Sequence, residues 1–201
     1  MKFSKISNAI KSFIVISVIF FFTLSVSFAA DIVELPVANQ LQFLQRMLSV
    51  EKQLSKSKEN EIMIGIIYQS DFKTSKKTAD NIKMYAEGKP IKAGNKTLKF
   101  IPIDIKKSKN VVGLLNEESY KLDVIMITQL SNINYSDIKK YAVDNSVLTF
   151  ATHQKTMETN KFSLAVGYKS NGFQLFFNPQ QISEEGFIFP ANVFIYAKKI
   201  E

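Results

Sequence analysis

The sequence contains no cysteine, no tryptophan and a single histidine, His153, and these absences remove whole classes of chemistry. Without cysteine the chain has no thiol nucleophile, no disulfide and no lipid-modified amino terminus. Zinc sites built from several His or Cys side chains are excluded for the same reason. No glycine-rich loop follows a strand and opens a helix, so a phosphate-binding loop is absent too. We therefore predict that the protein is not an enzyme and holds no metal or cofactor.

Arginine is equally scarce, because Arg46 is the only one among 26 basic side chains. Lysine is a hydrated point charge without the planar fork that grips a carboxylate or phosphate in two bonds. Arg46 is thus the single candidate for specific anion recognition, although a role beside a helix, with its stem on the surface, is the plainer interpretation. The formal net charge of +8 is mild, and it does not indicate nucleic-acid binding.

The amino terminus has the pattern of an export signal. Three lysines precede the apolar block at residues 13–26, and small residues follow it up to Ala29. This pattern predicts a signal peptide at residues 1–29, cleaved near Ala29, and a periplasmic mature protein with no integral membrane segment. The alternative is an uncleaved anchor, since the charge-free run at residues 12–30 approaches the length that spans a bilayer.

The remaining chain alternates apolar runs with amphipathic segments. Continuous apolar runs at residues 62–68, 123–127 and 147–151 are typical of strands buried on both faces. Residues 98–105 form another strand, which we place at a sheet edge because Pro102 lacks an amide hydrogen. An amphipathic helix of about five turns begins at Pro36 and precedes the first strand.

Shorter helical patterns, at residues 74–86, 111–115 and 136–142, separate these strands. The alternation predicts an α/β fold, with a mostly parallel sheet in the order 2-1-3-4 and right-handed crossovers. No linker interrupts residues 30–201. We therefore expect one three-layer domain with helices on both faces of the sheet.

The final third begins with a hairpin signal. Apolar residues alternate along 162–168 and 173–177, and Asn171-Gly172 between them favours a tight turn. Asn178 can then cap a short helix that ends before Gly186. The tail at residues 191–199 is expected to cover a face of the domain.

Four segments of this last third carry a resemblance to a known family. They are VLTF at 147–150, FQLFFN at 173–178, a glycine eight residues after Asn178, and FIFPANVFIYAK at 187–198. In this order they resemble the closing half of the YfiR-like family of small periplasmic regulatory proteins. The family's glycine pair is replaced here by residues 156–160, and its paired serines by Pro190-Ala191.

The resemblance implies a function in signalling. It implies a non-enzymatic periplasmic regulator that binds the periplasmic domain of an inner-membrane signalling protein and restrains it. The partner would be a diguanylate cyclase, which links the protein to cyclic-di-GMP signalling, or a sensor kinase. The aromatic-rich final third provides the candidate partner surface, which consists of Phe176, Phe187, Phe189 and Phe194.

The residues themselves also allow a second function, that of a small periplasmic solute-binding domain resembling one lobe of a substrate-binding protein. Ligands of open α/β sheets bind at the carboxyl ends of the strands. The candidate crevice there consists of Tyr68, Gln69, Ser70, Thr128, Gln129, Thr152 and His153. Their hydroxyls and amides suit a neutral or zwitterionic small molecule, although such residues also occur in ordinary turns. A two-lobed receptor would require a homodimer.

The adjacent acidic residues Glu184 and Glu185 are the last feature to weigh. Side chains at neighbouring helical positions diverge, so the two carboxyls are not placed as a general acid and base. We interpret the pair as a solvated helix end.

Overall fold

The computed structural model describes residues 35–56, 59–106, 110–117, 121–169 and 172–200. The predicted signal peptide at residues 1–29 lies outside these residues. The helices are α2 (Val37–Val50), α3 (Lys52–Lys56), α4 (Lys73–Gly88), α5 (Val111–Glu117), α6 (Tyr135–Asn145), α7 (Gln154–Asn160), α8 (Pro179–Glu184) and the 3-10 turn η1 (Ala191–Phe194). The strands are β1 (Glu61–Tyr68), β2 (Lys92–Ala93), β3 (Lys96–Asp104), β4 (Val124–Ile127), β5 (Leu148–Ala151), β6 (Leu164–Lys169), β7 (Gly172–Phe177) and β8 (Lys198–Lys199).

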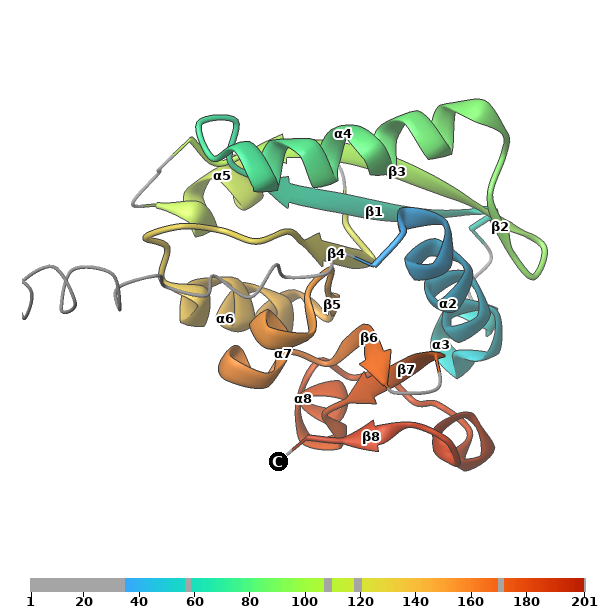
Figure 1. The fold of residues 1–201 in the computed structure, drawn as a ribbon. Coiled ribbons are helices and arrows are strands. Elements are labelled where there is room, and N and C mark those ends of the chain that lie inside the picture. Colours follow the sequence, from blue (N-terminus) through green and yellow to red (C-terminus); the bar gives the residue numbers. More distant parts are fainter. Residues whose placement is uncertain (1–34, 57–58, 107–109, 118–120, 170–171, 201) are drawn as a thin grey trace, which may run out of the picture. The chain divides into compact units, whose positions relative to one another are not determined.

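The strands form one sheet in the order β2-β3-β1-β4-β5-β6-β7-β8 (Figure 1). β3, β1, β4, β5 and β6 are parallel neighbours, and this confirms the predicted central order. Pro102 pairs with Ile66 of β1, while β2 covers only Lys96 and Thr97 on the other side of β3. The proline therefore lies where the strand needs no second partner, as its missing amide hydrogen requires.

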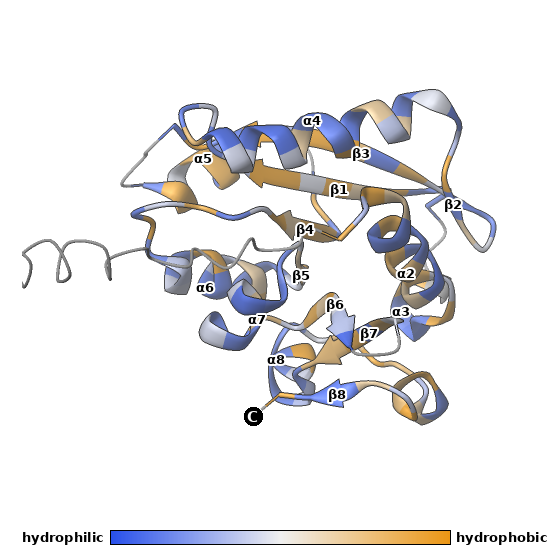
Figure 2. Ribbon diagram, in the orientation of Figure 1, coloured by the Kyte–Doolittle hydropathy of each residue, from blue (hydrophilic) through white to orange (hydrophobic). Residues whose placement is uncertain are grey.

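Helices cover both faces of the sheet and produce two hydrophobic cores. α2, α3 and α4 pack on one face, over side chains such as Ile64 and Phe150. α5, α6 and α7 pack on the other face, over side chains such as Ile67 and Ile125. Figure 2 shows the apolar colouring of the central strands β1 and β4, which are enclosed on both faces. The predicted three-layer α/β fold is therefore confirmed.

The first helix is shorter than its apolar pattern predicts. α2 stops at Val50 because Glu51 adopts an extended conformation, and α3 then starts at Lys52. Glu51 is buried, and its carboxylate accepts hydrogen bonds from the amides of Leu54 at 2.6 Å and Ile188 at 2.9 Å. The carboxylate thus caps α3 and joins it to the carboxyl-terminal third.

The carboxyl-terminal third contains the predicted hairpin of β6 and β7. The two strands are antiparallel, and their pairing runs from Leu164 opposite Phe177 to Lys169 opposite Gly172. Asn178 caps α8 by accepting from the amide of Gln181, and Gly186 has φ +83° just past the helix, as expected. The tail covers part of a face as expected, because Val193, Phe194 and Ala197 pack against the core, and β8 also extends the sheet edge beside β7. Among the described residues, no helix combines the length and apolar character needed to cross a membrane.

Candidate functional site

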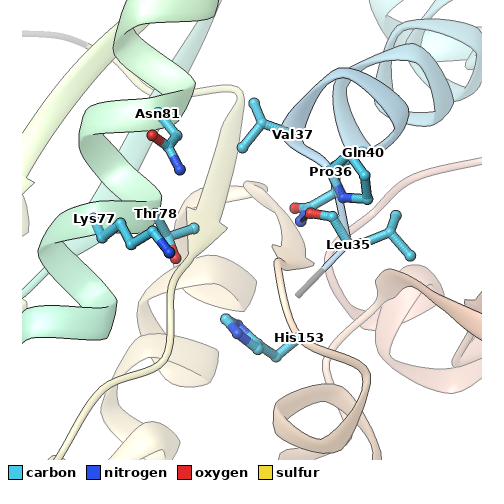
Figure 3. A pocket seen from close by; sticks show the side chains of 8 residues that line it. All are labelled: Leu35, Pro36, Val37, Gln40, Lys77, Thr78, Asn81 and His153. Carbon is cyan, nitrogen blue, oxygen red and sulfur yellow. Dashed lines mark hydrogen bonds between the residues drawn. The ribbon is translucent and has the colours of Figure 1, made fainter. Parts of the chain in front are cut away.

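A cavity of about 260 Å³ lies between α2 and α4, beside the loop that follows β5. α4 contributes one wall, the start of α2 contributes the opposite wall, and His153 lies below both (Figure 3). This volume is slightly below the roughly 300–1,000 Å³ of sites for drug-sized ligands, so it suits a small metabolite. The lining residues are Leu35, Pro36, Val37, Gln40, Lys77, Thr78, Asn81 and His153.

The topology of the sheet explains the position of this cavity. From β1 the chain continues to β3, which lies on one side of β1 in the sheet. The next strand, β4, lies on the other side of β1, so the direction in which strands are added reverses at β1. Crevices at such a reversal, outside the carboxyl ends of parallel strands, are the usual ligand sites of open α/β sheets. α4 follows β1 directly, and His153 follows the end of β5 by two residues. Both therefore reach the same edge of the sheet.

Gln40 is the most unusual residue of the cavity wall. Its side chain is only 2% exposed, and its amide nitrogen donates to the carbonyl oxygen of Leu35 at 2.9 Å. A carbonyl oxygen can only accept, so the atom that faces Leu35 must be the amide nitrogen. The remaining polar atom of the side chain is then the acceptor Oε1. Oε1 is buried and has no hydrogen-bond partner among the described residues. An acceptor of this kind favours a ligand that donates a hydrogen bond.

His153 is held at the cavity through its Nδ1 atom. The hydroxyl of Thr152 lies 3.1 Å from Nδ1 and 3.2 Å from the carbonyl oxygen of Ile127, to which it donates. The ring is 8% exposed and contributes to the cavity wall.

Three residues of the predicted crevice, Gln69, Thr128 and Thr152, are engaged by hydrogen bonds to other parts of the fold. The Gln69 side chain donates to the carbonyl of Ser131 at 3.0 Å and accepts from its amide at 2.6 Å. Thr128 bonds to Ser75 at 2.6 Å, and Thr152 bonds to Ile127 as described. The other predicted crevice residues, Tyr68, Ser70 and Gln129, are half-buried and do not line the cavity.

Of the predicted crevice, only His153 lines the cavity, and the sequence analysis missed the residues from α2 and α4. One signal for Gln40 existed in the sequence. It is a polar residue on the same helical stripe as Leu41, Leu44 and Leu48, and all four are buried. A polar side chain on a buried stripe requires a partner. No comparable signal marks Thr78 or Asn81.

The predicted partner surface needs correction. Phe176 and Phe187 are buried, so neither side chain is available to a partner. Phe194 stacks on Phe177 with ring centroids 4.1 Å apart and meets Phe189 edge to face at 5.8 Å, and these rings are partly buried in the core. Pattern alone cannot tell which of many aromatic residues are enclosed, because β8 and η1 cover part of the hairpin. The aromatic and aliphatic side chains exposed instead in this third are Tyr168, Phe173, Ile188, Ile195 and Tyr196.

Glu185 also differs from its interpretation as a solvated helix end. Its carboxylate is 0% exposed and accepts from the amide and hydroxyl of Thr149 at 3.0 and 2.7 Å. It also accepts from the Ser163 hydroxyl and from the Gln181 amide. Burial raises the pKa of Glu185 to about 7, although these donors act in the opposite direction. The Glu185 cluster (Thr149, Ser163, Gln181 and Glu185) thus joins β5 and α8 to the residue before β6.

Arg46 lies on the exposed side of α2 and lines an open groove of about 400 Å³ with Lys92. It caps no helix of the described chain through a side-chain hydrogen bond. Within the described residues, no group of three or more His, Asp or Glu side chains is arranged to hold a metal ion.

Three solved structures resemble this fold. An ABC domain from Streptococcus pneumoniae in complex with L-Trp has a TM-score of 0.58 and 13% identity, covering 83% of this chain and 60% of that one. A conserved domain protein from Vibrio cholerae has a TM-score of 0.57 and 16% identity, with the same coverage. A ligand-free, open substrate-binding protein with adhesive properties from Clostridium difficile has a TM-score of 0.52 and 15% identity, again with this coverage.

No protein-family model and no curated protein matches the chain. The chain spans 60% of the length of the solved structures named above, and identities of 13–16% show the fold alone. The likeness therefore shows that the chain has the α/β fold of these structures.

Proposed function

We propose that the protein is a small periplasmic solute-binding domain whose ligand occupies the cavity between α2 and α4. The observation that carries the proposal is Gln40 Oε1, a buried acceptor without a partner on the cavity wall. Leaving such an acceptor unpaired costs roughly 1–3 kcal/mol, and a ligand that donates to it recovers this free energy. Pairing Oε1 with a donor of the ligand therefore adds to the binding free energy.

The location of the cavity supports the proposal independently. It lies at the carboxyl edge of a parallel sheet, beside the strand where the order reverses. The fold is like that of domains whose structures are described as a complex with L-Trp or as a substrate-binding protein. Since the match covers 60% of those structures, the proposal concerns only the binding unit that these residues form.

A thermal-shift screen of small metabolites against the purified protein tests this proposal. A true ligand at 100 times its Kd should stabilise the fold by about 2.7 kcal/mol, which corresponds to a shift of several degrees. The Asn81→Phe variant, which fills the cavity, should abolish the shift. The matched control is Lys83→Phe, which places the same ring on the exposed side of the same helix and should leave the shift intact. A screen across metabolite classes without any shift would contradict the proposal.

The regulator that the YfiR-like resemblance implies remains a second candidate, favoured by a specific surface. The outer patch, Tyr168, Phe173, Ile195 and Tyr196, exposes apolar side chains on the hairpin and on the tail beside it. Tyr168 and Phe173 contact each other with centroids 5.3 Å apart, and Tyr196 is 90% exposed. Exposed aromatic side chains of this kind are enriched in protein interfaces.

This second function predicts micromolar or tighter binding to the periplasmic domain of an inner-membrane diguanylate cyclase or sensor kinase. Tyr196→Asp should weaken that binding by at least about tenfold if the outer patch is the interface. Val143→Asp changes an exposed apolar residue on α6 and should have no effect. Equal loss of binding in both variants would indicate a general defect rather than this interface.

A further inference from the structure

The chemistry of the cavity wall allows the class of ligand to be named. Resting on the proposed solute-binding function, we propose that the cavity selects small zwitterions, with a primary amine against Gln40 and an apolar tail between α2 and α4.

The acceptor side is set by Gln40. Its Oε1 can only accept, because the amide nitrogen is held by the Leu35 carbonyl. A primary amine in its ammonium form carries three N–H donors and can direct one of them to this oxygen. A carboxylate or ether in the same place would face the lone pairs of this oxygen with lone pairs of its own.

The charge at the rim limits the ligand further. Among the described residues that line the cavity, Lys77 is the only formally charged side chain, and it is exposed on α4. A ligand that is only a cation would meet no carboxylate from these residues and would be repelled by this lysine. A ligand with both an ammonium and a carboxylate can direct the first inward and the second toward Lys77. The wall thus favours a zwitterion over a simple amine.

The tail has a place beside the cavity. A second, more open hollow of about 400 Å³ is lined by Val37, Asn81, Met84 and Tyr85. It shares Val37 and Asn81 with the cavity, so the two adjoin each other. Met84 is an apolar side chain that is 65% exposed, and methionine adapts well to varied ligand shapes. An apolar ligand tail in this hollow would remove Met84 from water and gain affinity with each methylene buried.

Four probes, measured by isothermal titration calorimetry with the purified protein, test these statements separately. L-phenylalanine has all three groups, 3-phenylpropionate lacks the amine, phenethylamine lacks the carboxylate and glycine lacks the tail. We expect L-phenylalanine to bind most tightly and each of the other three to bind at least about tenfold more weakly, with 3-phenylpropionate weakest. Leucine in place of phenylalanine checks that the result does not depend on an aromatic ring.

Variants of Gln40 test whether this side chain accepts the hydrogen bond from the amine of the ligand. Gln40→Met removes the acceptor at nearly constant volume and should reduce the preference for L-phenylalanine over 3-phenylpropionate to less than about threefold. Gln40→Glu keeps an acceptor oxygen and should retain the preference. Gln42→Met makes the same chemical change on the exposed side of the helix, outside the cavity, and serves as the control. The melting temperature of each variant confirms that it is folded.

The outcomes separate the two proposals. Equal binding of L-phenylalanine and 3-phenylpropionate, or an amine preference that persists in Gln40→Met, would overturn the zwitterion inference while leaving solute binding in place. Silence from every zwitterion, while another metabolite produces a shift that Asn81→Phe abolishes, would do the same. Silence from the whole screen would overturn both.

Discussion

Two regions of this domain bury polar side chains, and they do so in opposite ways. In the Glu185 cluster every carboxylate oxygen accepts two hydrogen bonds, from donors on β5, on α8 and before β6. At the cavity between α2 and α4, Gln40 is also enclosed but has one acceptor that no described residue satisfies. A polar group that is fully paired by the protein contributes to the fold, whereas one left unpaired beside a cavity reserves its hydrogen bond for a ligand. On this reasoning the Glu185 cluster stabilises the fold, and Gln40 is reserved for binding.

The largest effect should come from breaking the satisfied region. Glu185→Ala removes the common acceptor of four donors that stay buried, so we expect a loss of at least about 4 kcal/mol in the free energy of unfolding. The adjacent Glu184 is exposed and bonds only to Gln180 at its own helix. Glu184→Ala should cost less than about 0.5 kcal/mol. Urea denaturation of both variants measures the difference, and similar losses would contradict the role of the cluster.

The same cluster should make stability depend on pH. The pKa of Glu185 is about 7 in the fold and near its ordinary value of 4.5 in the unfolded chain. Between these values the folded protein holds a proton that the unfolded chain releases, so stability is greatest below pH 4.5 and falls as the pH rises through 7. The loss is at most about 3 kcal/mol, since one pKa unit corresponds to about 1.4 kcal/mol.

Comparison with Glu185→Gln isolates this contribution. The amide cannot ionise, so the difference in unfolding free energy between wild type and variant should change between pH 5 and pH 8. Asp123, whose pKa burial also raises, is present in both proteins and cancels. A difference that stays constant across this range would show that Glu185 keeps the same charge in the folded and unfolded states.

The fold was largely predictable because its signals are local. A parallel strand covered by helices on both faces must be apolar at nearly every position, and the runs that became β1, β4 and β5 have that property. What the sequence could not give was long-range pairing. The break at Glu51 depends on Ile188, which is 137 residues away, and the burial of Glu185 depends on Thr149 and Ser163. Nothing in the neighbourhood of either glutamate distinguishes it from a solvated one.

The candidate site was less predictable for the same reason. Sequence position placed His153 at the correct edge of the sheet, because the ends of parallel strands are easy to locate. It also placed Gln69 and Thr128 there, but these side chains are held by Ser131 and Ser75. Side-chain geometry decides which polar residues at the edge of a sheet are hydrogen-bonded to others. Strand order does not reveal these pairings.

Glu51 is an intermediate case, since it is buried and paired but has fewer donors than Glu185. Glu51→Ala leaves the amides of Leu54 and Ile188 without their acceptor and removes the cap of α3. We expect a loss of about 2 kcal/mol in unfolding free energy. Glu87→Ala, at the exposed end of α4, should cost less than about 0.5 kcal/mol. If Glu51→Ala destabilised the protein as much as Glu185→Ala, the stability loss would not follow the number of hydrogen-bond donors that each carboxylate accepts.

The smallest effect on stability is expected where binding is proposed. Gln40→Met gives up one hydrogen bond, from Nε2 to the Leu35 carbonyl, which contributes about 1 kcal/mol. It also removes the buried, unpaired Oε1, whose desolvation costs a similar amount, so the two changes should offset one another to within about 1 kcal/mol. Urea denaturation without ligand measures this balance, with Gln42→Met as the exposed control. A loss above about 2 kcal/mol would mean that Gln40 serves the fold as Glu185 does. A near-neutral result, obtained in a side chain that is buried like Glu185, would show that burial alone does not decide whether a polar residue stabilises the fold.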